Sequence, residues 1–215
     1  MHKPPFRQQI IGFSLAILLL VGCGEAPVVA PTTVPTQVPT PTAQPTPTPQ
    51  AKRALFVIFS LFEESEYGVP RAILEDKGVL ISVASSSLKL VSGAGKTKVQ
   101  PDLMLSDVQT ADYDVIVFVG GYRYESANAD AIRVAQEAAS QGKLLAAICI
   151  APTTLARAGV LKGKRATTSL PGSALEAEGA IYTGALVERD GLIITANGPA
   201  ASRAFGEAIA NALEE

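Results

Sequence analysis

The sequence predicts an α/β fold with a mostly parallel central sheet that helices cover on both faces. From residue 52 onward, short apolar runs alternate with stretches of helical pattern. The runs are apolar throughout instead of alternating with polar residues, which is typical of strands buried on both faces. Strands that alternate with helices in this way are joined by crossover connections and lie parallel.

The strands are predicted from runs rich in Val, Ile, Leu, Phe and Ala. In chain order they cover residues 54–60, 79–85, 114–119, 144–148 and 192–195. Between the second and third runs, residues 90–100 hold Gly93 and Gly95 between short β-like pieces. Glycine between two such pieces predicts a hairpin.

The helices are predicted from apolar residues at helical spacing, bounded by start and stop signals. In chain order they cover residues 64–77, 127–141, 152–158 and 199–213. Gly78, Gly142 and Gly159 mark the ends of the first three predicted helices. Glycine is typical of this position because it readily adopts the left-handed conformation found at helix ends. Pro199 begins the last helix, a position where its missing N–H is no loss.

Residues 1–22 are predicted to be a lipoprotein signal peptide. A basic start is followed by an apolar run at residues 10–21, which is too short to span a bilayer comfortably. The run ends in LVGC, which resembles a bacterial lipobox, with cleavage before Cys23 and lipid on its thiol. An ordinary secretory signal or a signal anchor is the alternative. Lipidation implies that the protein is anchored to the cell membrane and faces outside the cytoplasm.

Residues 23–51 are predicted to be the lipidated cysteine and a linker, and residues 52–215 a single domain. Residues 27–50 consist mostly of Pro, Thr, Val, Ala and Gln without an apolar period. This composition is typical of an extended, semi-rigid linker of polyproline type. The remaining residues are enough to bury a substantial core.

Composition excludes several classes of partner and cofactor. Without residues 1–22 the chain keeps 16 of its 18 basic residues and all 20 acidic ones, so its net charge is −4 and no nucleic-acid partner is expected. His2, the single histidine, is also lost. With no histidine and one free thiol, no metal site is expected. The sequence has no glycine-rich phosphate loop, so no nucleotide cofactor is expected either.

Cys149 is the strongest candidate for chemistry. It directly follows the predicted strand at residues 144–148 and precedes the helix at residues 152–158. This pattern is that of a nucleophile elbow, where the helix N-terminus is expected to lower the pKa of the thiol. The alternative is a buried cysteine that acts only as a small apolar residue.

Two further loops are expected to meet Cys149, because ligands of such sheets bind beyond the carboxyl ends of the strands. Residues 61–68 (LFEESEYG) contain Glu66, and residues 119–122 (VGGY) contain a glycine pair. A protonated Glu66 beside the thiolate would make the two groups titrate together. An acidic residue that only favours the helix dipole is the alternative for Glu66.

These motifs, with residues 158–168 and the TANGP segment at residues 195–199, resemble the ThiJ/PfpI family of the class I glutamine amidotransferase-like superfamily. The resemblance extends over essentially all of residues 52–215. It implies a flavodoxin-like three-layer sandwich and the possibility of a homodimer. Family members include glyoxalases, proposed deglycases, peptidases, chaperones and sensors of oxidative stress.

The resemblance also implies roles for single residues. It places Glu66 within hydrogen-bonding distance of the Cys149 thiol and the backbone amides of Gly121 and Ile150 against an oxyanion. The other candidate pocket residues are Gly120, Tyr122, Arg123, Tyr124 and Ser169.

The sequence departs from the family where histidine is expected. Many family enzymes have histidine directly after the cysteine, where this chain has Ile150, and others have one after the double threonine, where it has Ser169. A Cys–His dyad, and with it a peptidase mechanism, is therefore excluded for the mature chain. Two functions remain open. One is a lyase or hydrolase of glyoxalase or deglycase type, in which Cys149 and Glu66 act on small reactive carbonyls. The other is a non-enzymatic oxidative-stress sensor or partner-binding module that uses the same cysteine.

Overall fold

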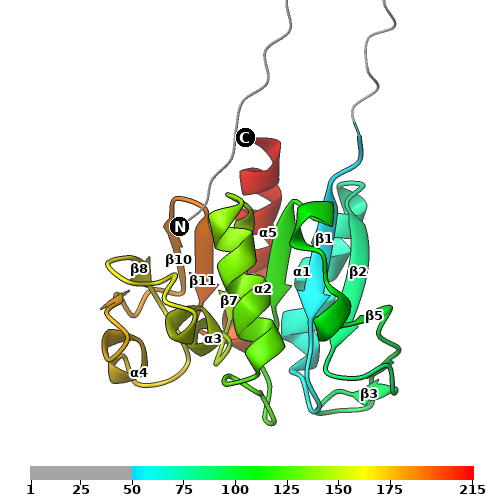
Figure 1. Cartoon of the computed structure of the whole chain (residues 1–215), viewed down its shortest axis with the longest axis horizontal. Coiled ribbons are helices and arrows are strands. Elements are labelled where there is room, and N and C mark those ends of the chain that lie inside the picture. The colour runs from blue at the N-terminus through cyan, green and yellow to red at the C-terminus, as the bar shows by residue number, and fades with distance from the viewer. Residues whose placement is uncertain (1–49) are drawn as a thin grey trace, which may run out of the picture. The chain divides into compact units, whose positions relative to one another are not determined.

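A seven-stranded sheet lies at the centre of the computed structural model, which describes residues 50–215 (Figure 1). The predicted signal peptide, Cys23 and nearly all of the linker lie outside these residues. Within residues 50–215, no helix has both the length and the apolar character needed to cross a bilayer.

The sheet has the strand order β10-β11-β7-β6-β1-β2-β5. In chain order the strands are β1 (Arg53–Val57), β2 (Leu80–Ser85), β5 (Leu103–Met104), β6 (Val115–Phe118), β7 (Leu144–Ile148), β10 (Val187–Asp190) and β11 (Ile193–Ala196). All neighbours are parallel except β10, which is antiparallel to β11. The mostly parallel sheet and its five predicted strands are thus confirmed, as β1, β2, β6, β7 and β11.

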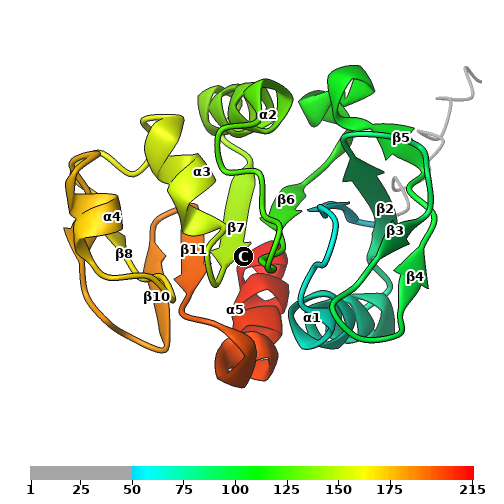
Figure 2. The same ribbon diagram turned by 90° about the horizontal axis from the view of Figure 1, so that it is seen from below.

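Helices cover both faces of this sheet, as predicted (Figure 2). α2 (Ala129–Ser140) and α3 (Pro152–Arg157) lie on one face, and α1 (Glu64–Asp76) and α5 (Ser202–Glu214) lie on the other. The last predicted helix begins with a 3₁₀ turn, η3 (Pro199–Ala201), before α5 continues it.

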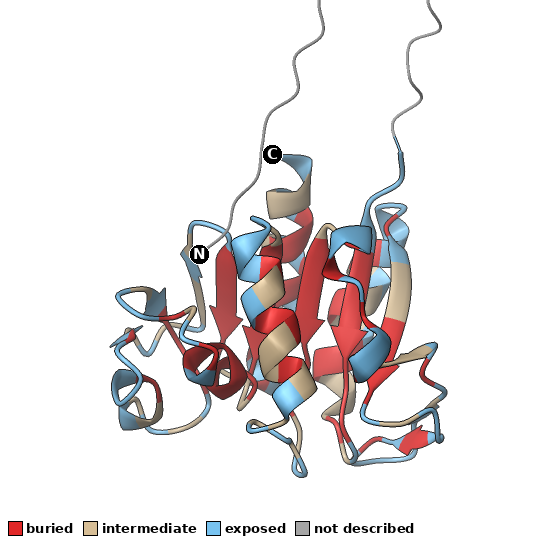
Figure 3. Cartoon of the chain, in the orientation of Figure 1, coloured by how far each residue is buried: buried red, intermediate tan, exposed pale blue. Residues whose placement is uncertain are grey.

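Two apolar clusters fill the space between the sheet and its helices. Successive residues of β1 enter different clusters: Leu55 packs in the cluster with Val134 of α2, and Phe56 in the cluster with Phe205 of α5. A strand that contributes to two cores has to be apolar on both faces, which explains the unbroken apolar runs in the sequence. Figure 3 shows the strands of the sheet buried behind α2, which carries buried, intermediate and exposed residues, and beside α3, which is almost entirely buried.

The elements that the sequence analysis missed are short or polar. β10 reads VERD and pairs only with β11 at the sheet edge, so it has no apolar run. The other additions are the two-residue strand β5 of the main sheet, β8 (Arg165–Ala166), β9 (Ile181–Tyr182), α4 (Ser173–Glu176) and the 3₁₀ turns η1 (Leu105–Asp107) and η2 (Thr110–Asp112). The expected hairpin is present as β3 (Val91–Ser92) paired antiparallel with β4 (Lys98–Val99).

The four parallel strands β1, β6, β7 and β11 end level with one another, and Val57 of β1 lies beside Phe118 of β6. Phe118 of β6 lies beside Ala147 of β7, and Ala196 of β11 lies beside Ile148. The loops that follow β1, β6 and β7 therefore emerge at the same edge of the sheet, at the bottom of Figure 1.

Candidate active site

A cavity of about 340 Å³ lies at this edge of the sheet. It is lined by Glu63, Glu66, Gly121, Tyr122, Cys149, Ile150, Ser169, Leu170 and Pro199. Most of the candidate site residues thus come together around one space, although they are contributed by segments far apart in the chain.

Cys149 occupies a strained turn directly after β7. Its φ is +65°, in the left-handed region that residues other than glycine adopt uncommonly. Three hydrogen bonds hold this backbone. The Cys149 N–H donates to Ala196 O at 2.8 Å, and its carbonyl accepts from the Ser169 N–H at 2.9 Å and the Thr168 hydroxyl at 2.7 Å. The surrounding structure therefore stabilises a conformation that costs about 1–3 kcal/mol by itself.

Glu66 reaches the same place from the first turn of α1. Its side chain is fully buried, and neither of its carboxyl oxygens makes a hydrogen bond within the described part of the chain. Burial raises its pKa to about 7. The nearby Cys149 thiol opposes the shift, the charge of Glu63 adds to it, and the Gly120 amide opposes it. A carboxyl with this pKa exchanges protons readily at neutral pH.

Gly120 makes the approach of these two groups possible. A Cβ atom at this position would lie 2.6 Å from Cys149 Cβ and 2.6 Å from Glu66 Oε2. Real Cβ atoms do not approach other atoms so closely, so any larger residue would push the thiol and the carboxyl apart. Gly120 thus underlies the site without lining its cavity.

The Cys149 thiol has a raised pKa. Burial is the main cause, the Ser169 hydroxyl lowers the value, the charge of Glu66 raises it, and the Ile150 amide lowers it. The expectation of a lowered pKa is therefore wrong in its net direction. The Ile150 amide just before α3 does lower the pKa, but burial beside a carboxyl outweighs it. The resting site holds a neutral thiol next to a titrating carboxyl.

Ser169 contacts the sulfur where other family members are expected to have histidine. Its Oγ lies 3.2 Å from Cys149 Sγ. The segment that carries it follows β8 and is fixed to β11 by a hydrogen bond from the Thr167 N–H to Thr195 Oγ1 at 2.9 Å. A hydroxyl orients a thiol but is a poor base at neutral pH, so Glu66 is the proton acceptor in reach.

The amides of Gly121 and Ile150 belong to the cavity lining. Gly121 has φ +155°, and a Cβ atom there would lie 2.5 Å from Leu61 O. Neither N–H donates to a carbonyl or side-chain oxygen within residues 50–215. The Gly121 N–H is thus available to a bound oxygen, whereas the Ile150 N–H interacts with the Cys149 sulfur and lowers its pKa. The role of both against an oxyanion stays a prediction.

Two candidate residues take no part in the cavity. Arg123 is exposed and does not line it. Tyr124 points into the core, where its ring packs edge-on against Phe59 at 5.2 Å and its hydroxyl lies 2.9 Å from Thr154 Oγ1. The expectation that these residues line the pocket is wrong, because Arg123 is exposed and Tyr124 packs against Phe59 and Thr154 instead.

Sequence reasoning overlooked Glu63, Leu170 and Pro199 as lining residues. Glu63 also caps α1, since its side chain accepts from the Ser65 N–H at 3.4 Å and from the Ser65 hydroxyl at 3.1 Å. The signal available in the sequence was its place at the end of the loop after β1, where a cap residue also faces the sheet edge.

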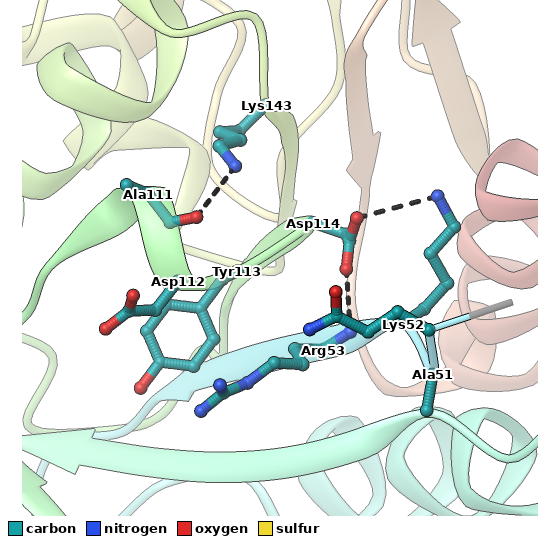
Figure 4. Close-up of a pocket in the computed structure, with 9 residues that line it drawn as sticks. Ala51, Lys52, Arg53, Ala111, Asp112, Tyr113, Asp114 and Lys143 are labelled. Carbon is teal, nitrogen blue, oxygen red and sulfur yellow. Dashed lines mark hydrogen bonds and ion pairs between the residues drawn. The ribbon is translucent and has the colours of Figure 1, made fainter. Parts of the chain in front are cut away.

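A second cavity, of about 290 Å³, lies at the opposite edge of the sheet (Figure 4). Three of its charged side chains have partners within the described residues. Asp114 accepts from the Arg53 N–H at 2.8 Å and lies 3.5 Å from Lys52 Nζ, while Lys143 Nζ donates to Ala111 O at 3.1 Å. This cavity lacks the unpaired buried group that distinguishes the one around Cys149.

Comparisons with known proteins agree with this architecture. Residues 52–212 match the model of the DJ-1/PfpI family. An uncharacterised protein of Methanocaldococcus jannaschii is 36% identical over 160 residues, covering 72% of this chain and 78% of its own length. A protein named as a deglycase in Pyrococcus abyssi is 34% identical over 122 residues, covering 56% of this chain and 73% of its own.

A solved structure shares the fold. The crystal structure of a ThiJ/PfpI domain protein from Brachyspira murdochii superposes with a TM-score of 0.73 at 25% identity, covering 77% of this chain and 98% of that one. The matching family model, the sequence relatives and this structure all agree. The chain therefore belongs to the DJ-1/PfpI family.

Proposed function

We propose that this chain is a cysteine-dependent enzyme of glyoxalase or deglycase type that acts on small reactive carbonyl compounds. The observation that carries the proposal is the buried Glu66 carboxyl, without a hydrogen-bond partner in the described residues, in the cavity of the Cys149 thiol. Relatives named as deglycases in Pyrococcus species support it.

The chemistry needs no histidine. The sulfur of Cys149 forms a bond to the aldehyde carbon of a 2-oxoaldehyde, and the C=O π electrons move to the oxygen. Glu66 accepts the thiol proton and returns it to that oxygen, which leaves a neutral hemithioacetal. A pKa of about 7 suits Glu66 to both transfers at neutral pH. The amides of Gly121 and Ile150 stabilise the negative oxygen in between.

The test is turnover of methylglyoxal by the purified chain and three variants. Cys149→Ala and Glu66→Ala are expected to abolish turnover, because they remove the nucleophile and the proton acceptor. Arg123→Ala is the control, since this exposed side chain lies outside the cavity. Turnover that is absent, or that survives in Cys149→Ala, would refute the proposal.

The alternative function, an oxidative-stress sensor or binding module, stays a prediction. The raised pKa of Cys149 weighs against it, because the thiolate is the form that peroxide oxidises. Mass spectrometry after mild peroxide treatment distinguishes the two functions. Selective oxidation of Cys149 in the folded chain, without methylglyoxal turnover, would favour the sensor.

We also propose that lipid on Cys23 anchors the chain to the cell membrane, with the domain outside the cytoplasm. The apolar run at residues 10–21, the LVGC sequence that ends it and the Pro/Thr-rich segment that follows support this proposal. A homodimer remains an expectation from the family.

A further inference from the structure

The cavity around Cys149 is lined by acidic side chains and by no basic ones. Two carboxyl groups, Glu63 and Glu66, belong to its lining, and every other lining side chain is apolar or uncharged. Arg123, the nearest basic residue along the chain to the glycine pair, is exposed and does not line it. The charged side chains that a ligand meets in this space are therefore both acidic.

Glu63 is held firmly beside the reacting pair. Its backbone N–H donates to Gly120 O at 3.0 Å, and Gly120 is the residue at which a Cβ atom would meet Cys149 Cβ and Glu66 Oε2. Its side chain caps α1 through Ser65, which fixes the carboxylate at a helix N-terminus, where negative charge is stabilised. The charge of Glu63 also contributes to the shifted pKa of Glu66, so the two carboxyls interact across the cavity.

We propose that Glu63 selects substrates by charge, so that the Cys149 cavity admits uncharged 2-oxoaldehydes and excludes carbonyl compounds that carry a carboxylate. This proposal rests on the proposed function for its substrates. Its physical basis is repulsion between like charges in a partly buried site, where screening by water is weak. The neutral 2-oxopentanal and the anionic 4,5-dioxopentanoate make the comparison, because both are 2-oxoaldehydes of the same chain length and they differ in charge.

Two variants of neighbouring acidic residues test the proposal in the full chain. Glu63→Gln removes the charge, and its amide oxygen can still accept the capping hydrogen bond from Ser65. Glu64→Gln is the matched control, because Glu64 is adjacent but does not line the cavity; its carboxylate accepts from the Gly95 N–H at 3.0 Å and the Thr97 N–H at 2.7 Å.

The first readout is the ratio of kcat/KM for 2-oxopentanal to kcat/KM for 4,5-dioxopentanoate. We expect the wild-type chain to prefer 2-oxopentanal and Glu63→Gln to reduce this preference by about tenfold, which corresponds to about 1.4 kcal/mol of repulsion. Glu64→Gln is expected to keep the wild-type ratio. An unchanged ratio in Glu63→Gln would overturn the proposal.

The second readout needs no turnover and so separates this proposal from the proposed function. Iodoacetamide and iodoacetate alkylate thiols similarly but differ in charge, and mass spectrometry measures their rates at Cys149 alone. We expect the iodoacetamide-to-iodoacetate rate ratio of the wild-type chain to exceed that of a free thiol, and Glu63→Gln to lower it. If neither aldehyde is turned over but this shift occurs, the proposed function fails and the charge selection by Glu63 stands. Equal ratios in the wild-type and Glu63→Gln chains would refute the selection itself.

Discussion

At the scale of single residues, burial of the Glu66 carboxyl lowers the stability of the fold at neutral pH and also suits this group to proton transfer. A fully buried carboxyl without a hydrogen-bond partner among the described residues loses the water that would stabilise its charge, and its pKa rises to about 7. The same shift makes it a base that can accept a thiol proton at neutral pH and release it again. Both consequences can be measured separately.

The catalytic consequence appears in the pH dependence of methylglyoxal turnover. Only ionised Glu66 accepts the thiol proton, so kcat/KM is expected to rise with pH through about 7. Because the carboxyl and the thiol interact, the measured value belongs to the pair. Glu66→Gln is expected to lower kcat/KM about 100-fold and to lack this rise. A rise centred near the ordinary carboxyl value of 4.5 would contradict the assignment.

The energetic consequence appears in the pH dependence of stability. The folded state holds the Glu66 proton more tightly than the unfolded chain, so this group lowers the free energy of unfolding as pH rises from about 4.5 to 7. The loss amounts to about 3 kcal/mol. In urea titrations at pH 4.5 and pH 8, the wild-type chain is expected to lose about that much more stability than Glu66→Gln. Parallel behaviour of the two chains would show that Glu66 is not shifted.

At the scale of elements, Gly120 has no side chain, and this allows three segments to approach one another closely. These segments are the end of β6, the turn after β7 and the start of α1. Gly120→Ala would place a Cβ atom against Cys149, Glu66 and the carbonyl of Ile148, and we expect it to destabilise the fold by about 1–3 kcal/mol. Gly68→Ala is the control, because this exposed glycine of α1 has nothing within 4 Å of the added atom.

The control is expected to stabilise the chain by about 0.5–1 kcal/mol, since alanine is the better helix former. Urea unfolding measures both changes, and the iodoacetamide rate at Cys149 reports whether the site itself has moved. Equal stability of Gly120→Ala and the wild-type chain would show that the site has more room than the structure gives it.

The elements also show what a sequence can predict and why. β1, β6 and β7 were predictable because each strand contributes to two cores and is therefore apolar along its whole length. β10 was not, because an edge strand with polar residues has no such run. Position along the chain placed Cys149 and Glu66 at one edge of the sheet, but it gave no side-chain direction. Tyr124, next to the cavity in sequence, points into the core instead.

The pKa of Cys149 could not be predicted from the sequence either, because it also depends on how the side chains pack. The sequence places Cys149 before a helix, which suggests a lowered pKa, whereas burial of the thiol beside Glu66 raises it. Burial depends on contacts between segments distant in the chain, and these exist only in the folded molecule. The same holds for Glu63, whose two roles as helix cap and cavity wall become visible only when α1 is seen against the loop after β6.

At the scale of the whole molecule, the proposed lipid on Cys23 would confine the reactive site to the membrane surface. Cys23→Ser removes the thiol that carries the lipid, and we expect the variant to leave the membrane fraction of expressing cells. Cys149→Ser is the matched control, because it removes the other cysteine of the chain and is expected to remain with the membrane. Retention of Cys23→Ser after salt and alkaline washes would contradict lipid anchoring. It would favour an uncleaved signal anchor at residues 10–21, since an apolar segment holds a chain in the bilayer without any lipid.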